Sequence, residues 1–158
     1  MGKLANGAKA GLLAGIVFAA IASIILYFLF LSMKEEIITR IEQGLIATGI
    51  PSLPEKLKPE SIFDFFLIVS PLFFGLGSMV IGVLIGIIYS YIEPKIPIPN
   101  PIVKGIILAL IFWFLLGFLP ALPSLYQMSG FNFILLLPTL VYGILLGYFY
   151  SRFAKKAF

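Results

Sequence analysis

Three ionisable residues stand at the edges of long apolar stretches. Asp64 and Glu93 bracket one stretch, and Lys104 immediately precedes another. A charged group in apolar surroundings is costly and often marks a proton or cation pathway. The alternative is a structural role, in which Asp64 caps a helix and Glu93 pairs with Lys95 at the surface. We favour the structural role for both carboxylates.

Other catalytic chemistry has few candidate residues. The chain contains no histidine and no cysteine, which excludes disulfides, thiolate metal sites and an imidazole base. Neither a GxSxG nucleophile elbow nor a Walker loop nor an EF-hand occurs. We therefore expect no enzyme activity, no cofactor and no bound metal.

Tyrosines cluster near the ends of two apolar stretches, at Tyr89, Tyr91, Tyr142, Tyr148 and Tyr150. Tyrosine is enriched where a membrane protein meets the lipid headgroups, because its ring is apolar and its hydroxyl is polar. We interpret these residues as interfacial anchors. A pocket for a quinone or a lipid headgroup is the alternative.

The elements that carry these residues are apolar helices. Of the 158 residues, 61% are hydrophobic and 11% are charged, and the mean hydropathy is +1.12. Soluble domains carry about 25% charged residues, and roughly 20 apolar residues cross a bilayer. Uncharged runs cover 10–33, 65–92 and 105–151, and the last contains turn residues at 119–130. The sequence predicts an all-α integral membrane protein with four transmembrane helices, at about 8–33, 62–92, 101–119 and 131–153.

Small residues recur every fourth position in three of these spans. Residues 78–92, SMVIGVLIGIIYSYI, closely resemble 139–153, TLVYGILLGYFYSRF. Such a spacing places small side chains on one helical stripe, along which two membrane helices can approach closely. The predicted packing residues are Gly7, Gly11, Gly15, Ser78, Gly82, Gly86, Ser90, Thr139, Gly143, Gly147 and Ser151.

The similarity of the stripes predicts an internal duplication within a single transmembrane domain, 1–158. One helical hairpin would comprise 7–92 and the other 101–153, as parallel repeats related by an axis along the membrane normal. Pro71 and Pro138 do not align in the two copies. We interpret both prolines as sites of local helix kinks.

The connector 34–61 sets the first hairpin apart from the second. Its first part predicts an amphipathic helix on the extracytoplasmic side, and a proline-rich linker follows. The helix could lie on the membrane, cap the bundle or continue the first span. Ser61 to Asp64 predicts a capping box that opens the second span. The aliphatic face of the helix comprises Ile37, Ile38, Ile41, Leu45 and Ile46.

Basic residues favour one side of the predicted membrane. They occur in both terminal tails and in the connector after the second span, whereas the long connector balances its basic residues with acidic ones. The positive-inside rule therefore predicts a multi-pass cell-membrane protein with a cytoplasmic N-terminus and C-terminus. The basic tails are too short to indicate nucleic-acid binding. The scarcity of Asn and Gln hints at a thermophilic source.

Three functional hypotheses follow. The favoured one is a subunit that associates with itself or with another membrane protein through its helix faces. The first alternative is a small oligomeric channel or transporter, with a hydrated path near Ser70, Ser78, Thr139 or Tyr142. The second is a subunit associated with a lipid or quinone near the tyrosines. Membrane lipids are expected partners in all three.

Overall fold

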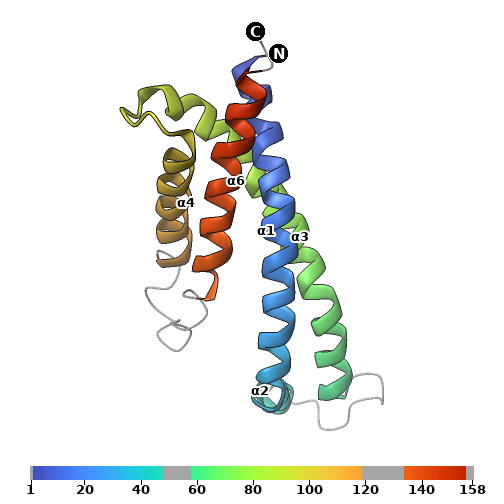
Figure 1. Cartoon of the computed structure of the whole chain (residues 1–158). Coiled ribbons are helices and arrows are strands. Elements are labelled where there is room, and N and C mark those ends of the chain that lie inside the picture. Colours follow the sequence, from blue (N-terminus) through green and yellow to red (C-terminus); the bar gives the residue numbers. More distant parts are fainter. Residues whose placement is uncertain (1, 48–57, 119–133, 156–158) are drawn as a thin grey trace. The chain divides into compact units, whose positions relative to one another are not determined.

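The computed structural model describes residues 2–47, 58–118 and 134–155, and every regular element in these ranges is helical (Figure 1). The predicted all-α class is confirmed. Within these ranges, two helical segments, Lys3–Ser32 and Pro59–Lys95, are long and apolar enough to cross a membrane. The elements are α1 (Lys3–Ser32), α2 (Lys34–Ala47), α3 (Pro59–Ile92), the short 3-10 helix η2 (Glu93–Lys95), α4 (Pro101–Phe118) and α6 (Leu136–Lys155).

The predicted capping box at Ser61–Asp64 is wrong, because α3 begins earlier, at Pro59. Proline is favoured at the first helical position, where its missing N–H would have no partner in any case. The Ile62 amide donates to the Lys58 carbonyl oxygen at 3.1 Å, which closes the first turn. Ser61 therefore lies inside the helix. Most of the proline-rich linker and the predicted turn at 119–130 lie outside the described residues.

The two prolines have different positions in their helices. Pro138 occupies the first turn of α6, where no amide partner within α6 is lost, and a turn at residue 135 immediately precedes this helix. The Thr139 amide donates to the Leu135 carbonyl oxygen at 3.1 Å. Pro71 does lie inside α3, and the helix continues through it.

The chain forms two compact units, which divide α1 and α3 between them. The first comprises Met1–Ala22 and Gly75–Phe158, and the second comprises Ser23–Phe74. The first unit thus contains the start of α1, the end of α3, and α4 and α6. Its core consists of Ala10, Ala14, Ile85, Tyr89, Leu108, Ala109, Tyr142, Leu146 and Tyr150.

The second unit contains the end of α1, α2 and the start of α3. Its buried side chains are large, among them Leu26, Phe63 and Leu67. The rings of Phe30 and Phe66 lie 5.3 Å apart between their centroids. This unit is therefore packed with bulky apolar side chains.

Candidate functional site

The start of α1 and the end of α3 touch through their backbones. Gly11 lies against the backbone of Gly82 and Gly86, and a Cβ atom placed on Gly82 would lie 2.7 Å from the Gly11 carbonyl oxygen. Gly7 faces Gly86, and Gly15 lies opposite the main chain at Ser78. Moving four residues toward the C-terminus of α1 therefore corresponds to moving four residues toward the N-terminus of α3. We call this contact the α1–α3 seam.

A second seam joins α4 to α6. A Cβ atom on Gly143 would lie 2.7 Å from the Ile106 Cα, and one on Gly147 would lie 2.6 Å from the Ile102 Cα. Gly105 in turn faces the Gly143 carbonyl oxygen. Real Cβ atoms do not approach backbone this closely, so any larger residue would force the helices apart.

Three hydroxyl groups of the stripes bond to carbonyl oxygens in or just before their own helices. Ser90 Oγ donates to the Ile87 carbonyl oxygen at 2.7 Å, and Ser151 Oγ donates to the Tyr148 carbonyl oxygen at 2.8 Å. Thr139 Oγ1 donates to a carbonyl oxygen four residues earlier, at 2.7 Å. Each hydroxyl is thus hydrogen-bonded locally, as helical serine and threonine often are. Of the three residues, Ser90 lies against Gly7 in the α1–α3 seam.

Tyr142 connects the two seams. Its side chain is buried, and its hydroxyl donates to the Gly82 carbonyl oxygen at 3.0 Å. Its ring also meets the edge of Phe18, with 6.1 Å between the centroids. A residue of α6 thereby fixes a point on α3 in the middle of the α1–α3 seam.

A partly buried ion pair joins η2, directly after α3, to the start of α4. Lys104 Nζ donates to Glu93 Oε1 and to the Glu93 carbonyl oxygen, each at 2.8 Å. The two side chains are 8% and 25% exposed, respectively. The predicted pairing of Glu93 with Lys95 is therefore wrong. Lys95 Nζ instead lies 4.4 Å from the centroid of the Tyr91 ring.

Tyr89 strengthens the same junction. Its hydroxyl donates to the Pro101 carbonyl oxygen at 2.7 Å, and its ring meets the edge of Tyr150 with 5.1 Å between centroids. Tyr89, Tyr142 and Tyr150 are all buried, so the prediction that they are lipid anchors is wrong for these three. We call Tyr89, Glu93, Pro101 and Lys104 the polar clasp.

The third polar candidate, Asp64, has quite different surroundings. It is exposed in the second turn of α3, near the helix N-terminus. The predicted role of Asp64 as a helix cap is therefore wrong, because the charge of a helix end acts within the first turn and α3 begins at Pro59. Asp64 belongs to the second compact unit, and the polar clasp belongs to the first.

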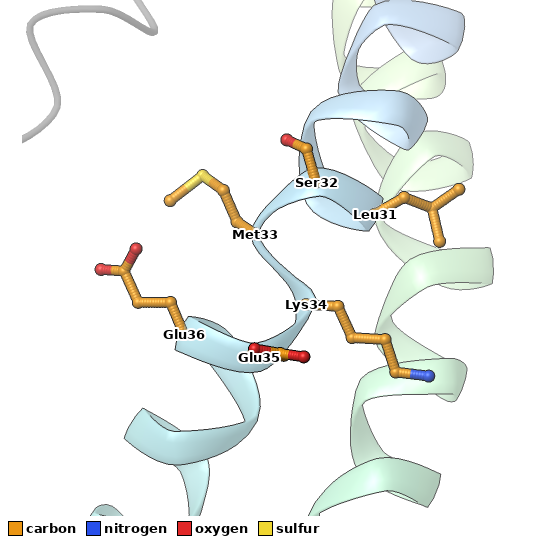
Figure 2. Close-up of a pocket in the computed structure, with 6 residues that line it drawn as sticks. All are labelled: Leu31, Ser32, Met33, Lys34, Glu35 and Glu36. Carbon is orange, nitrogen blue, oxygen red and sulfur yellow. The ribbon is translucent and has the colours of Figure 1, made fainter.

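A shallow concavity lies at the junction of α1 and α2, where six consecutive residues from Leu31 to Glu36 line it (Figure 2). Lys34 points toward α3, whereas Met33 and Glu36 point to the other side. Lys34 Nζ lies 5.6 Å from the centroid of the Phe63 ring. Glu36 Oε1 accepts a hydrogen bond from Arg40 Nη2 at 2.7 Å. The junction is thus fixed by a cation–π contact and flanked by an ion pair within α2.

Within 2–47, 58–118 and 134–155, no group of three or more His, Cys, Asp or Glu residues could hold a metal ion. No protein-family model matches the sequence, and no curated protein or solved structure matches it.

Sequence reasoning missed two links of the site. The bond from Tyr142 to Gly82 joins residues 60 positions apart, and nothing in either stripe specifies which tyrosine would reach which carbonyl. The pair of Glu93 and Lys104 left a weak signal, since opposite charges flank a short connector rich in proline. The nearer Lys95 was the simpler choice of partner.

Proposed function

We propose that the protein is a four-span membrane protein that acts as a structural subunit, associating with copies of itself or with another membrane protein. Its spans would be α1, α3, α4 and α6, with both termini in the cytoplasm. The antiparallel seams support this topology: Gly7 lies beside Ser90, and Pro101 lies beside Gly147. The basic N-terminal and C-terminal segments thereby gather near the connector that carries Lys95, in agreement with the positive-inside rule.

One observation carries the proposed association: α3 has two opposite stripes in the first compact unit. The stripe of Ser78, Gly82, Gly86 and Ser90 faces α1. A second stripe, two residues out of step, therefore faces away from it. This outer ridge consists of Leu76, Val80, Leu84 and Ile88, which are all exposed.

The outer ridge suits helix association because its residues are large, aliphatic and spaced by one helical turn. The small-residue stripe is already used within the chain, so contact with a partner would employ the outer ridge. Ridges spaced by four residues can pack into the grooves of another helix. In hydrocarbon, such packing is driven by van der Waals contact.

The channel alternative would place water near Ser70, Ser78, Thr139 or Tyr142, and the last two of these residues count against it. Both side chains are buried, and both hydroxyls already donate to backbone carbonyl oxygens. A hydrated path there would require these hydrogen bonds to break. This arrangement favours the structural subunit over the channel.

Disulfide crosslinking in native membranes tests the proposed association. The chain has no cysteine, so single variants Val80→Cys and Leu84→Cys report on the outer ridge without background. Ile85→Cys is the matched control, because Ile85 is buried within the chain. We expect crosslinked species of defined size at positions 80 and 84 and none at 85.

A strict monomer would contradict the proposal. If positions 76, 80, 84 and 88 all fail to crosslink, and native mass spectrometry shows a single chain with no co-purifying protein, the outer ridge contacts lipid only. Ion or solute flux from proteoliposomes would then support the channel or transporter alternative. A tightly bound quinone or distinct lipid would support the alternative of a lipid- or quinone-associated subunit.

A further inference from the structure

The helix α2 has a polar side and an aliphatic side. Ile37, Ile38, Ile41 and Leu45 are half-buried, and α2 contains no buried residue. Ile46, near the end of α2, is 70% exposed. The aliphatic face of α2 is therefore incompletely covered by the described part of the chain.

The junction with α1 turns α2 away from the axis of α1 (Figures 1 and 2). The helix is interrupted at Met33, where the apolar run ends, between the end of α1 at Ser32 and the start of α2 at Lys34. Ser32 Oγ donates to the Leu29 carbonyl oxygen at 2.7 Å. Back-bonding of this kind competes with the helical hydrogen bonds and favours a bend. Residues 34–47 thus do not continue α1 as one straight helix.

The aliphatic face is oriented by Lys34. Residues 34, 38, 41 and 45 fall on one stripe of a helix. Lys34 points toward α3 and lies over the Phe63 ring (Figure 2). Ile38, Ile41 and Leu45 share this stripe with Lys34. They therefore lie on the side of α2 that faces the apolar helix α3.

We infer that α2 lies along the extracytoplasmic surface of the bilayer, with Ile37, Ile38, Ile41 and Leu45 in contact with lipid. The inference rests on the proposed function, since it requires α1 to cross the membrane. An amphipathic helix of this kind sits about 5–10 Å into the boundary between headgroups and acyl chains. Its bend at Met33 places it where the apolar run of α1 ends.

The charges of α2 specify the kind of membrane surface. The helix carries Lys34 and Arg40 against Glu35, Glu36 and Glu42. Attraction to anionic lipid requires an excess of basic residues, which α2 lacks. The binding is therefore hydrophobic, and a zwitterionic phosphatidylcholine surface suffices.

Spin labels on single cysteines test this placement in phosphatidylcholine proteoliposomes. The variants Ile38→Cys and Ile41→Cys report the aliphatic face, and Thr39→Cys and Gln43→Cys are matched controls on the polar face. We expect the ratio of oxygen to nickel-chelate accessibility to be several-fold higher at 38 and 41 than at 39 and 43. Adding anionic lipid should leave this ratio unchanged.

Two outcomes would overturn the inference. High nickel accessibility at all four positions would place α2 in water. Low accessibility of positions 38 and 41 to both reagents would mean that protein, either this chain or a second copy, covers the face.

A label at Phe28→Cys separates failure of the inference from failure of the proposed topology. Phe28 is an exposed residue of α1. Oxygen-rich, nickel-poor surroundings at position 28 would keep α1 in the membrane even if α2 is found in water. Nickel-rich surroundings at position 28 would contradict the spanning of α1 and the inference with it.

Discussion

The helices α1 and α3 pack in opposite ways in the two compact units. In the first unit the α1–α3 seam consists of glycines, and backbone touches backbone. In the second unit the same helices present Leu26, Phe63 and Leu67 as buried residues. The helices α1 and α3 thus pack backbone against backbone in the first unit and through large side chains in the second.

The two kinds of contact differ in the substitutions that they can tolerate. A seam of glycines gains close van der Waals contact, but the neighbouring backbone cannot move aside for an added atom. A contact of large side chains depends on total volume and can repack when the volume is conserved. Ser23 Oγ adds a hydrogen bond to the Pro71 carbonyl oxygen at 3.1 Å in the second unit. We therefore expect sensitivity to added atoms in one unit and to removed atoms in the other.

The largest expected effect is that of Gly11→Leu. The new side chain would meet the backbone of Gly82 and Gly86, so the cost should exceed the roughly 1–3 kcal/mol of ordinary overpacking. We expect no folded protein to be recovered by size-exclusion chromatography in detergent. Gly44→Leu is the control, because a Cβ atom at Gly44 meets nothing within 4 Å. Normal folding of Gly11→Leu would contradict the seam.

Phe63→Ala tests the second unit. Phe63 is fully buried, and removing such a ring costs about 3–5 kcal/mol. Urea or SDS titration followed by circular dichroism should show this loss in the free energy of unfolding. The neighbouring Phe65 is 69% exposed, so Phe65→Ala should have a much smaller effect. Equal losses for both variants would mean that Phe63 is not a packing residue.

Lys104→Met tests the polar clasp. The variant leaves the Glu93 carboxylate without its buried partner, which costs about 3–5 kcal/mol for a fully buried pair. Because the Glu93 side chain is 25% exposed, we expect about 2–3 kcal/mol. The double variant Lys104→Met with Glu93→Gln should regain part of the lost stability. If the double variant loses the sum of both single losses, the two residues act independently.

Tyr142→Phe should have the smallest of these effects. It removes the hydrogen bond to the Gly82 carbonyl oxygen but keeps the ring beside Phe18. Hydrogen bonds between membrane helices contribute about 0.6 kcal/mol on average and at most about 1.7. Thermal unfolding in detergent should show a small decrease in Tm. A loss as large as that of Phe63→Ala would give the hydroxyl a role beyond packing.

Local sequence pattern predicted the helices and the small-residue stripes well. Gly82 and Gly86 were singled out by spacing alone, and the structure places them against Gly7 and Gly11. A four-residue spacing specifies a helical face without reference to the rest of the chain. The sequence therefore predicts which face of α3 carries the small residues, but it does not predict which helix packs against that face.

Partner choice over longer distances was not predictable. Lys95 and Lys104 are both basic residues near Glu93 in the sequence, and in the structure the distant Lys104 is the one that pairs with Glu93. Similarly, Ser61 fits the pattern of a helix cap, whereas α3 begins two residues earlier, at Pro59. In both cases a nearby residue fits the local pattern, but the structure uses a different residue. The internal duplication stays a prediction.

The most direct test of the central claim compares two alanine variants in one helix. Alanine has a higher helix propensity than glycine, by about 1 kcal/mol. Gly77 of α3 has nothing within 4 Å of an added Cβ atom, whereas at Gly82 that atom would lie 2.7 Å from the Gly11 carbonyl oxygen. We therefore expect different Tm values in detergent. Relative to the unsubstituted protein, the Tm should be unchanged or higher for Gly77→Ala and lower for Gly82→Ala. Equal Tm values for the two variants would contradict the backbone contact between α1 and α3.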